Sequence, residues 1–133
     1  MAITKQKGDI GQSVIMARIM LDGYKVAIPV GEDWRFDLIV LKDGKLQRVQ
    51  CKYVTSNGQR IDVPCRSANS HSVKKYTATE IDWIVVYDST TDKCYYLPSS
   101  LLGDKGRHYI SLRLTPPRNG SKGAHQAKDF ENW

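Results

Sequence analysis

Three side chains of different chemistry, Asp37, Gln50 and Lys52, occur at a spacing that suits a reaction on a phosphate ester. Carboxylate and amide oxygens are hard ligands of the kind that Mg²⁺ prefers, and a bound Mg²⁺ keeps several waters and accepts phosphate oxygens. A lysine beside such an ion can orient an attacking water or stabilise developing negative charge. The three residues therefore predict metal-assisted chemistry on a phosphate, provided that the fold brings them together.

A strand hairpin is the element that would position them. Residues 36–41 form an apolar run typical of a strand, and residues 46–52 alternate between apolar and polar side chains. Between these segments, Asp43-Gly44 is a strong hairpin signal. Two adjacent antiparallel strands are therefore expected, with Asp37 at the start of the first strand and close to the end of the second.

Strand alternation decides which side chains of the second strand share a face. Gln50 and Lys52 lie on one face, whereas Val49 and Cys51 lie on the other. Asp37 is then expected near Gln50 and Lys52. The alternative is a polar hairpin face that merely contacts solvent, which is the commoner fate of such residues. The same alternation predicts that Cys51 is a small buried core residue and not a nucleophile.

Four segments in a fixed order carry a resemblance to a known family. They are residues 7–12, which open a helix, and residues 35–38, 48–52 and 112–120. Together with the spacing between Asp37 and the Gln-x-Lys motif, they resemble the PD-(D/E)XK nuclease superfamily, in particular its branch of group I intron homing endonucleases with a Gln-x-Lys third motif. The resemblance spans nearly the whole chain.

The resemblance implies an α+β fold with a PD-(D/E)XK (restriction-endonuclease-like) core, in which a mixed central sheet is flanked by helices. It also implies that Mg²⁺ is bound by Asp37, the side-chain oxygen of Gln50 and the backbone carbonyl of Cys51, with Lys52 beside the attacking water. At the position of Gln12 the family typically has a Glu that reaches toward the metal, so Gln12 joins the catalytic candidates. Amides at these two positions make the site less negative, and weak metal binding with slow or absent cleavage is expected.

The function implied by the resemblance is Mg²⁺-dependent, sequence-specific cleavage of double-stranded DNA, of the homing endonuclease type. A small subunit needs a second copy to cut both strands, so a two-fold dimer is expected, or a tetramer where the target is long and asymmetric. Two alternatives stay open. A junction-resolving nuclease would share the fold but recognise branched, Holliday-type DNA. A non-catalytic DNA-binding protein would fit the lack of charge at Gln12 and Gln50.

Charge and one polar segment indicate a nucleic acid partner. The chain carries 20 Lys and Arg against 14 Asp and Glu, with a formal net charge of +6 and a pI near 9.3, which suits a polyanion. Residues 66–76 are polar, basic and free of acids, so they are expected to form a loop along a DNA groove, unless they are only a flexible surface loop. The candidate DNA contacts are Arg35, Arg60, Arg66, Ser67, Lys74, Lys75, Arg118 and Lys122.

Length and composition favour one domain in the 133 residues, which the resemblance makes a nuclease domain. Its core is expected at about residues 8–114, with a basic, Pro- and Gly-rich C-terminal extension at residues 115–133. Cys51, Cys65 and Cys94 form no CxxC pair, which favours a reducing compartment. No secretory segment or membrane span is visible, so a cytoplasmic location is expected. The histidines lack the spacing of a zinc site.

The rest of the chain is expected to supply the scaffold. Helical spacing of apolar residues predicts a helix over residues 9–21 that stops at Gly23, and the apolar run at residues 81–87 predicts a central buried strand. Asp82, which opens that strand, is interpreted as a cap or hydrogen-bond partner. Further expected elements are strands at 24–29, 94–98 and 109–114 and short helical turns at 77–80 and 99–102. Residues 127–133 are expected to form a short helical or aromatic-anchored tail, and a second hairpin is expected to turn at Asn57-Gly58, with its return strand at 60–65.

Overall fold

One long helix, α1 (Thr4–Leu21), opens the fold. The computed structural model describes residues 4–68, 72–116 and 125–133. The helix begins before the predicted residue 9 and stops as predicted at Gly23, whose φ of 96° is the left-handed conformation that glycine adopts without strain. Ile15 and Ile19, on its inner face, are fully buried. Within the described ranges, no helix is long and apolar enough to cross a membrane.

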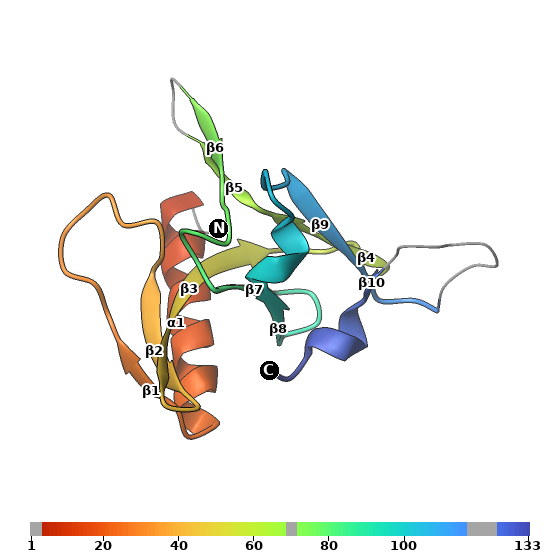
Figure 1. The fold of residues 1–133 in the computed structure, drawn as a ribbon. Helices are drawn as coiled ribbons and strands as arrows, with labels where there is room; N and C mark the ends of the chain where they lie inside the picture. Colours follow the sequence, from red (N-terminus) through yellow and green to blue (C-terminus); the bar gives the residue numbers. More distant parts are fainter. Residues whose placement is uncertain (1–3, 69–71, 117–124) are drawn as a thin grey trace.

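A mixed five-stranded sheet forms the centre of the molecule (Figure 1). The predicted hairpin is present, and Asp43 and Gly44 turn it with φ values of 52° and 77°, as a two-residue hairpin loop requires. The predicted buried strand pairs in parallel with the second strand of this hairpin, and the other pairs are antiparallel. Across the sheet the order is β1 (Lys25–Ala27), β2 (Leu38–Lys42), β3 (Lys45–Val54), β7 (Trp83–Asp88) and β8 (Lys93–Pro98).

A second sheet contains the strand that follows Asn57-Gly58. The prediction that this strand returns along β3 is wrong, because β4 pairs with β9 instead. The Asn57 side chain accepts two backbone N–H groups, at 2.9 and 3.0 Å, which bends the chain without hairpin geometry. Burial then decides the pairing, since Ile61 lies opposite Leu112 and both are fully buried. The strands of this sheet, in order, are β10 (His125–Gln126), β9 (Tyr109–Arg113) and β4 (Arg60–Pro64).

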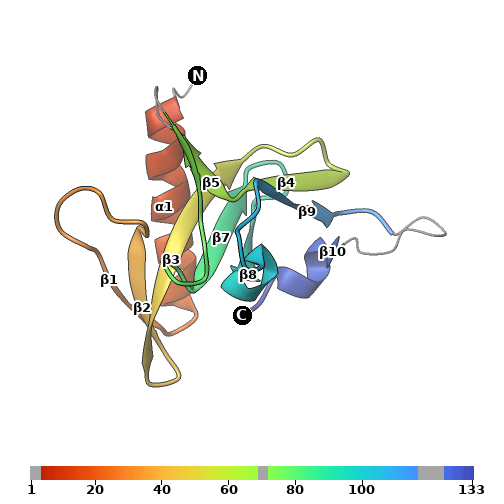
Figure 2. The same cartoon turned by 45° about the horizontal axis from the view of Figure 1, so that its top comes forward.

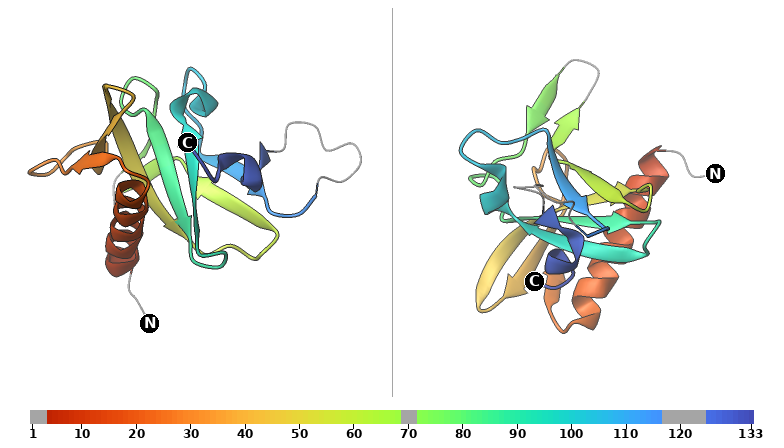
Figure 3. Two further views of the ribbon diagram at one scale, coloured as in Figure 1. Left: turned by 90° about the horizontal axis from the view of Figure 1, so that it is seen from below. Right: turned by 90° about the vertical axis from the view of Figure 1, so that its right-hand side faces the viewer.

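Different elements cover the two faces of the central sheet (Figures 2 and 3). α1 packs on one face, over a buried cluster that includes Leu38, Val40 and Val49. The second sheet and two short 3₁₀ helices, η1 (Ser99–Leu102) and η2 (Ala127–Phe130), lie over the other face. The predicted α+β fold with a mixed central sheet is therefore confirmed. In the described residues α1 is the only α-helix, because η1 and η2 stay at single 3₁₀ turns.

A small hairpin formed by β5 (Arg66–Ala68) and β6 (Val73–Lys75) projects from the body (Figure 1). The prediction of a loop at residues 66–76 is wrong for the residues described there, because two short strands pair in this segment. Their side chains are mostly polar and basic, so no alternating apolar pattern indicates the strands in the sequence. The backbone N–H of Tyr76 donates to the carbonyl of Cys65 at 2.9 Å. This bond closes the base of the β5–β6 hairpin on the body.

The last residues, 125–133, pack onto the body. The indole of Trp133 contacts the rings of Tyr24, Trp83 and Tyr96, with centroid distances of 5.4, 5.3 and 5.0 Å. This confirms an aromatic-anchored C-terminal tail, while the predicted division near residue 114 stays a prediction.

Candidate active site

The candidate site forms where β2 separates from β3. Pairing of the two strands starts with Leu38 opposite Val49, so Asp37 lies at the point of separation. The backbone N–H of Asp37 donates to the carbonyl of Val49 (2.9 Å), and its side-chain Oδ2 accepts from the N–H of Cys51 (2.9 Å). The carboxylate thus takes the place of a strand partner, which fixes its orientation at the edge of β3.

Gln50 and the backbone of Cys51 meet Asp37 at this edge. Nε2 of Gln50 donates to the carbonyl oxygen of Cys51 at 3.4 Å, and the Gln50 side chain is buried. The N–H and C=O of one strand residue point to the same side of the strand, so Cys51 presents both groups to the edge that β2 has left. One hydrogen-bonded chain therefore connects Asp37 and Gln50 through the backbone N–H and C=O of Cys51. Direct contact between the two side chains stays a prediction.

The side chain of Cys51 points away from this edge, as strand alternation predicts. It packs with Ile15, Val49 and Val85 beneath α1. Burial raises the pKa of its thiol well above the ordinary value, so the thiol stays protonated and unreactive. Cys51 therefore contributes its backbone to the site and its side chain to the core.

Asp37 and Lys52 influence each other's protonation. Burial raises the pKa of Asp37, while the Cys51 N–H and the charge of Lys52 oppose that rise. Burial lowers the pKa of Lys52, which the charge of Asp37 counteracts and the charge of Arg35 reinforces. Both pKa values shift toward neutrality, as is typical of groups that hold or transfer protons in active sites. A cation bound beside Asp37 would favour its ionised form and lower its pKa.

The ammonium of Lys52 is held by the β5–β6 hairpin and its base. Nζ donates to the backbone carbonyl of Arg66 (3.1 Å) and lies 5.0 Å from the centre of the Tyr76 ring. Tyr76 is buried, and sequence reasoning did not place it in the site. No local pattern could have found it, because β4 and the β5–β6 hairpin lie between Lys52 and Tyr76 in the chain.

Gln12 reaches the site because α1 approaches β3 closely. A Cβ atom at the preceding residue, Gly11, would lie 3.0 Å from the Cβ of Tyr53, so glycine allows this approach without a shift of Tyr53 or of the helix. Gln12 is half-buried and lines, with Asp37, an open pocket of about 290 Å³. The segment between β1 and β2 forms the other wall, and it adds the carboxylate of Asp33. The structure thus brings Gln12 and Asp37 to one pocket.

The oxygen atoms at this strand edge are of the kinds that bind a hard cation. In the described residues, no group of three or more His, Cys, Asp or Glu side chains could hold a metal ion. A site here would instead combine the Asp37 carboxylate with two neutral oxygens, the Gln50 amide and the Cys51 carbonyl. Oxygens of these types suit Mg²⁺. The Gln50 amide carries a donor on one side and an acceptor on the other, so rotation of the amide would present its oxygen beside the Cys51 carbonyl.

Four of the candidate DNA contacts lie on the β5–β6 hairpin. Arg66 pairs with Lys75 and Ser67 with Lys74 across its two strands. Lys74 is exposed, whereas the Arg66 guanidinium is engaged by the ring nitrogen Nδ1 of His108 (3.1 Å) and donates to the Tyr109 hydroxyl (2.9 Å). The hairpin therefore gathers basic groups on a projecting element, and their contact with DNA stays a prediction.

Of the other candidate DNA contacts, Arg60 lies apart from this hairpin. Arg60 is exposed at the opposite end of β4, opposite Arg113, and forms an ion pair with Asp62 (3.1 Å). Arg118 and Lys122 lie outside the described residues. The structure thus does not bring Arg60 to the candidate site.

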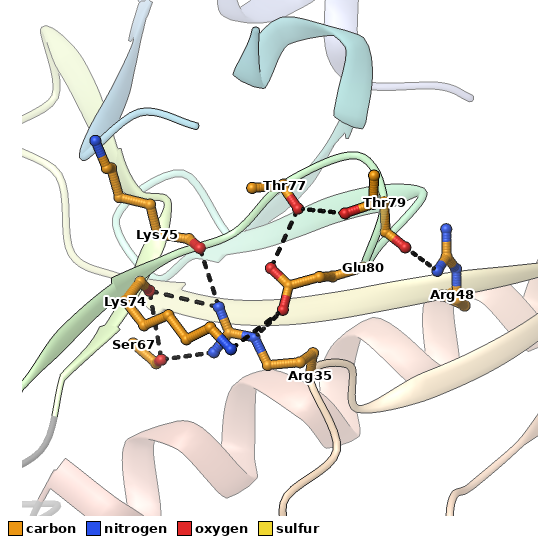
Figure 4. Close-up of polar contacts among 8 residues, drawn as sticks. All are labelled: Arg35, Arg48, Ser67, Lys74, Lys75, Thr77, Thr79 and Glu80. Atoms are coloured by element: carbon orange, nitrogen blue, oxygen red, sulfur yellow. Dashed lines mark hydrogen bonds and ion pairs between the residues drawn. The ribbon is translucent and has the colours of Figure 1, made fainter. Parts of the chain in front are cut away.

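Arg35 is engaged within the protein (Figure 4). Its Nε pairs with Oε2 of Glu80 at 2.8 Å, and its terminal nitrogens donate to Oγ of Ser67 (2.8 Å) and to the carbonyl of Lys75 (3.1 Å). Its guanidinium carbon lies 4.3 Å from the centre of the Tyr76 ring. Arg35 therefore joins the segment before Asp37 to the hairpin, and its predicted contact with DNA stays a prediction.

Asp82 is a hydrogen-bond partner, as predicted. Its Oδ2 accepts from the backbone N–H of Arg48 (2.8 Å) and from Nε of the same residue (3.0 Å). The Arg48 guanidinium lowers the pKa of Asp82. This pair closes the edge where β3 meets the turn before β7, and it lies outside the candidate site.

Comparison with known proteins places the chain in a family. Residues 2–133 match the family model of the PD-(D/E)XK endonuclease. The structure resembles that of a bacterial homing endonuclease, I-Ssp6803I, with a TM-score of 0.68 and 20% sequence identity over 97% of this chain and 88% of the other. At that identity the likeness concerns the fold, and no curated protein sequence gives a significant match. The family match over the whole chain, on a fold that places Asp37 and Lys52 at one strand edge, shows that this protein belongs to the PD-(D/E)XK endonuclease family and is a nuclease of that type.

Proposed function

We propose that the protein is a Mg²⁺-dependent, sequence-specific endonuclease of double-stranded DNA, of the homing endonuclease type. The observation that carries the proposal is the hydrogen-bonded chain of Asp37, Cys51 and Gln50 at the edge of β3. Lys52 is electrostatically coupled to the carboxylate of this chain. A fixed carboxylate and two neutral oxygens can hold a divalent cation, and with an ammonium beside them they suit hydrolysis of a phosphodiester.

The residues of the chain have distinct roles in this proposal. Asp37, the Gln50 amide oxygen and the Cys51 carbonyl would hold the ion. When bound, Mg²⁺ would supply positive charge to the scissile phosphate and lower the pKa of an attacking water. The Cys51 N–H keeps the Asp37 carboxylate in position.

Lys52 would act on the phosphate and the water. Its ammonium stabilises the negative charge that develops as the water oxygen attacks phosphorus. The attacking water bonds to phosphorus through its oxygen and releases a proton to solvent. The bond from phosphorus to the leaving 3′-oxygen breaks, that oxygen takes up a proton from solvent, and the products are a 5′-phosphate and a 3′-hydroxyl. Gln12, beside Asp37, contributes no charge, so weak metal binding and slow cleavage are expected of the chain as it stands.

The partner would be a DNA duplex with approximate two-fold symmetry. Each subunit carries one candidate site, so cutting both strands requires at least a homodimer, and a tetramer suits a long target. The basic β5–β6 hairpin is a two-stranded ribbon, an element of the size that the major groove of DNA admits.

A cleavage assay on two DNA shapes tests the proposal. A duplex is first selected from a randomised pool by binding in Ca²⁺, and the selected duplex and a four-way junction are then incubated with the protein and Mg²⁺. Cutting of both strands of the selected duplex supports the proposal. Cutting of the junction alone would replace it with a junction-resolving function. Binding with no cutting by the protein or by its Gln12→Glu variant would replace it with a non-catalytic function, which the lone motif carboxylate Asp37 would then explain.

A further inference from the structure

The β5–β6 hairpin carries candidate DNA contacts and also holds the lysine of the site. Nζ of Lys52 donates to the carbonyl of Arg66, which lies in β5, and lies beside the ring of Tyr76, which follows β6. Both contacts come from the hairpin or its base. The position of the ammonium therefore depends on where the hairpin sits relative to the central sheet.

Arg35 and Glu80 fix the hairpin in place (Figure 4). Their ion pair of 2.8 Å joins side chains that are 22% and 21% exposed, so solvent screens it less than a surface pair. The other nitrogens of the Arg35 fork donate to Ser67 of β5 and to the carbonyl of Lys75 of β6. The guanidinium also lies over the ring of Tyr76. One planar side chain thus ties both strands of the hairpin to the body.

Arg35 also lies two residues before Asp37 in the chain. The segment that presents the carboxylate is therefore joined, through one guanidinium, to the hairpin that presents the lysine. Since the pair contacts neither the reacting atoms nor the candidate metal-holding oxygens, its action on the site is indirect.

We propose that Arg35 and Glu80 are positioning residues, which couple the β5–β6 hairpin to Lys52. Through this ion pair, binding of the hairpin to DNA also positions the Lys52 ammonium opposite Asp37. Loss of the ion pair frees the hairpin, and the lysine then loses its carbonyl and ring contacts. The effect on cleavage rests on the proposed nuclease function, whereas the coupling of hairpin and lysine is a property of the free protein.

The Arg48–Asp82 pair provides a matched control at the same turn. Its ion pair is 3.0 Å long, with side chains that are 33% and 31% exposed. In the described residues the further partners of Arg48 are the carbonyls of Ala78 and Thr79, and neither belongs to the hairpin. Asp82→Asn therefore removes a similar charge from a similar network without touching Lys52, whereas Glu80→Gln removes the charge that holds Arg35.

The first measurement follows the lysine by NMR in the absence of metal and DNA. Because Nζ of Lys52 lies over the Tyr76 ring, 5.0 Å from its centre, ring current is expected to shift the resonance of the adjacent ε-methylene protons upfield from that of solvated lysines. Lys52→Arg identifies the peak. Glu80→Gln is expected to return the resonance to the position of solvated lysines, and Asp82→Asn to leave it shifted. An unchanged upfield resonance in Glu80→Gln would overturn the coupling.

The second measurement separates cleavage from binding by using enough duplex to saturate the protein. The substitutions are made in whichever form cuts faster, the chain as it stands or its Gln12→Glu variant. Glu80→Gln is expected to slow single-turnover cleavage by about tenfold to a hundredfold, the scale of a misplaced catalytic group. Its affinity in Ca²⁺ should stay within about threefold, because phosphate contacts dominate binding. Arg35→Lys, which keeps the charge but not the planar guanidinium, is a milder second variant, and its cleavage rate should be intermediate.

Cleavage by Glu80→Gln at the rate of Asp82→Asn would overturn the positioning role. If no form cuts DNA and the NMR resonance still moves in Glu80→Gln alone, the coupling of hairpin and lysine holds and the nuclease function is what fails.

Discussion

At the scale of single residues, the Asp37 carboxylate accepts from the Cys51 N–H and feels the charge of Lys52, while the Gln50 amide bonds the Cys51 carbonyl. A carboxylate in place of that amide would give a more negative site. The geometry keeps the carboxylate oriented, but burial disfavours its ionised form, since its pKa is raised. A cation bound beside Asp37 would favour the ionised form. The charge of nearby residues, above all at position 12, should therefore control how well it works.

Gln12→Glu is expected to raise Mg²⁺-dependent cleavage by at least roughly tenfold, the scale on which a positioned catalytic side chain begins to show. The added charge lies on the helix turn that shares a pocket with Asp37 and strengthens metal binding. The measurement is single-turnover cleavage by both forms over a Mg²⁺ titration, with affinity in Ca²⁺ as the control. Equal rates at every metal concentration would show that Gln12 has only a structural role.

Asp37→Asn should stabilise the metal-free protein at neutral pH by about 0.5–1 kcal/mol, within the range of functionally costly stabilising substitutions. Because the folded-state pKa of Asp37 is raised, its ionisation costs stability as pH rises through the unfolded and then the folded value. The amide keeps the acceptor for the Cys51 N–H and never ionises. The stability gained by Asp37→Asn should therefore appear at neutral pH and vanish below about pH 4, near the ordinary pKa of Asp.

Urea unfolding in EDTA at several pH values measures this difference. Asp43→Asn is the control, since Asp43 is exposed in the β2–β3 turn and an Asn-Gly pair suits that turn equally well. An advantage of Asp37→Asn that persists at acid pH would show that burial of the charge is not its cause.

The residues of the site differ in how far the sequence reveals them. Asp37, Gln50 and Lys52 are found because strand alternation and one Asp-Gly turn fix their relation within a short stretch of chain. Tyr76 and Glu80 lie in a polar segment with no periodicity, and their contacts with Lys52 and Arg35 join distant parts of the chain. Such contacts depend on tertiary packing, which local patterns do not encode.

At the scale of elements, the same distinction separates right from wrong predictions. The β2–β3 hairpin is local and its turn residues specify it, whereas the partner of β4 is decided by burial against β9, about fifty residues later in the chain. The β5–β6 hairpin shows a third case. Its strands carry basic and polar side chains and little apolar pattern, so the sequence does not reveal their pairing.

The prediction for the β5–β6 hairpin concerns the salt dependence of DNA affinity. Replacing Lys74 and Lys75 with Gln should reduce the slope of log affinity against log salt by about two, and adding Arg66→Gln should bring the loss to nearly three, at roughly 0.9 per phosphate contact. The matched control is Lys25→Gln with Lys45→Gln, at exposed positions in β1 and β3 near the β2–β3 turn, which lies at the other end of the molecule from the hairpin (Figure 1). An equal loss of slope in both pairs would place the DNA surface elsewhere.

At the scale of the whole molecule, two apolar clusters on either side of one sheet hold the site at their common edge. α1 seals one cluster and brings Gln12 to the site, while the second sheet seals the other and leads into the β5–β6 hairpin. The C-terminal tail completes both clusters, through Ala127 in one and Trp133 in the other.

Trp133→Ala is expected to destabilise the protein by about 2–4 kcal/mol, because it empties a site lined by three aromatic rings. Trp34→Ala is the control. Trp34 is 52% exposed, and its loss should cost about 1 kcal/mol or less. Thermal and urea unfolding of both variants provide the comparison, and equal stability losses would show that the tail does not anchor the core.

The most direct test of the assigned active site is single-turnover cleavage of the selected duplex in Mg²⁺ by the Gln12→Glu form, alone and combined with Asp37→Asn or Lys52→Ala. We expect each combination to abolish cleavage, because one removes the charged ligand and the other the ammonium, while affinity in Ca²⁺ stays within about an order of magnitude since phosphate contacts supply most of the binding. Mg²⁺-dependent cleavage that survives both substitutions would contradict the assignment of Asp37 and Lys52 as the catalytic pair.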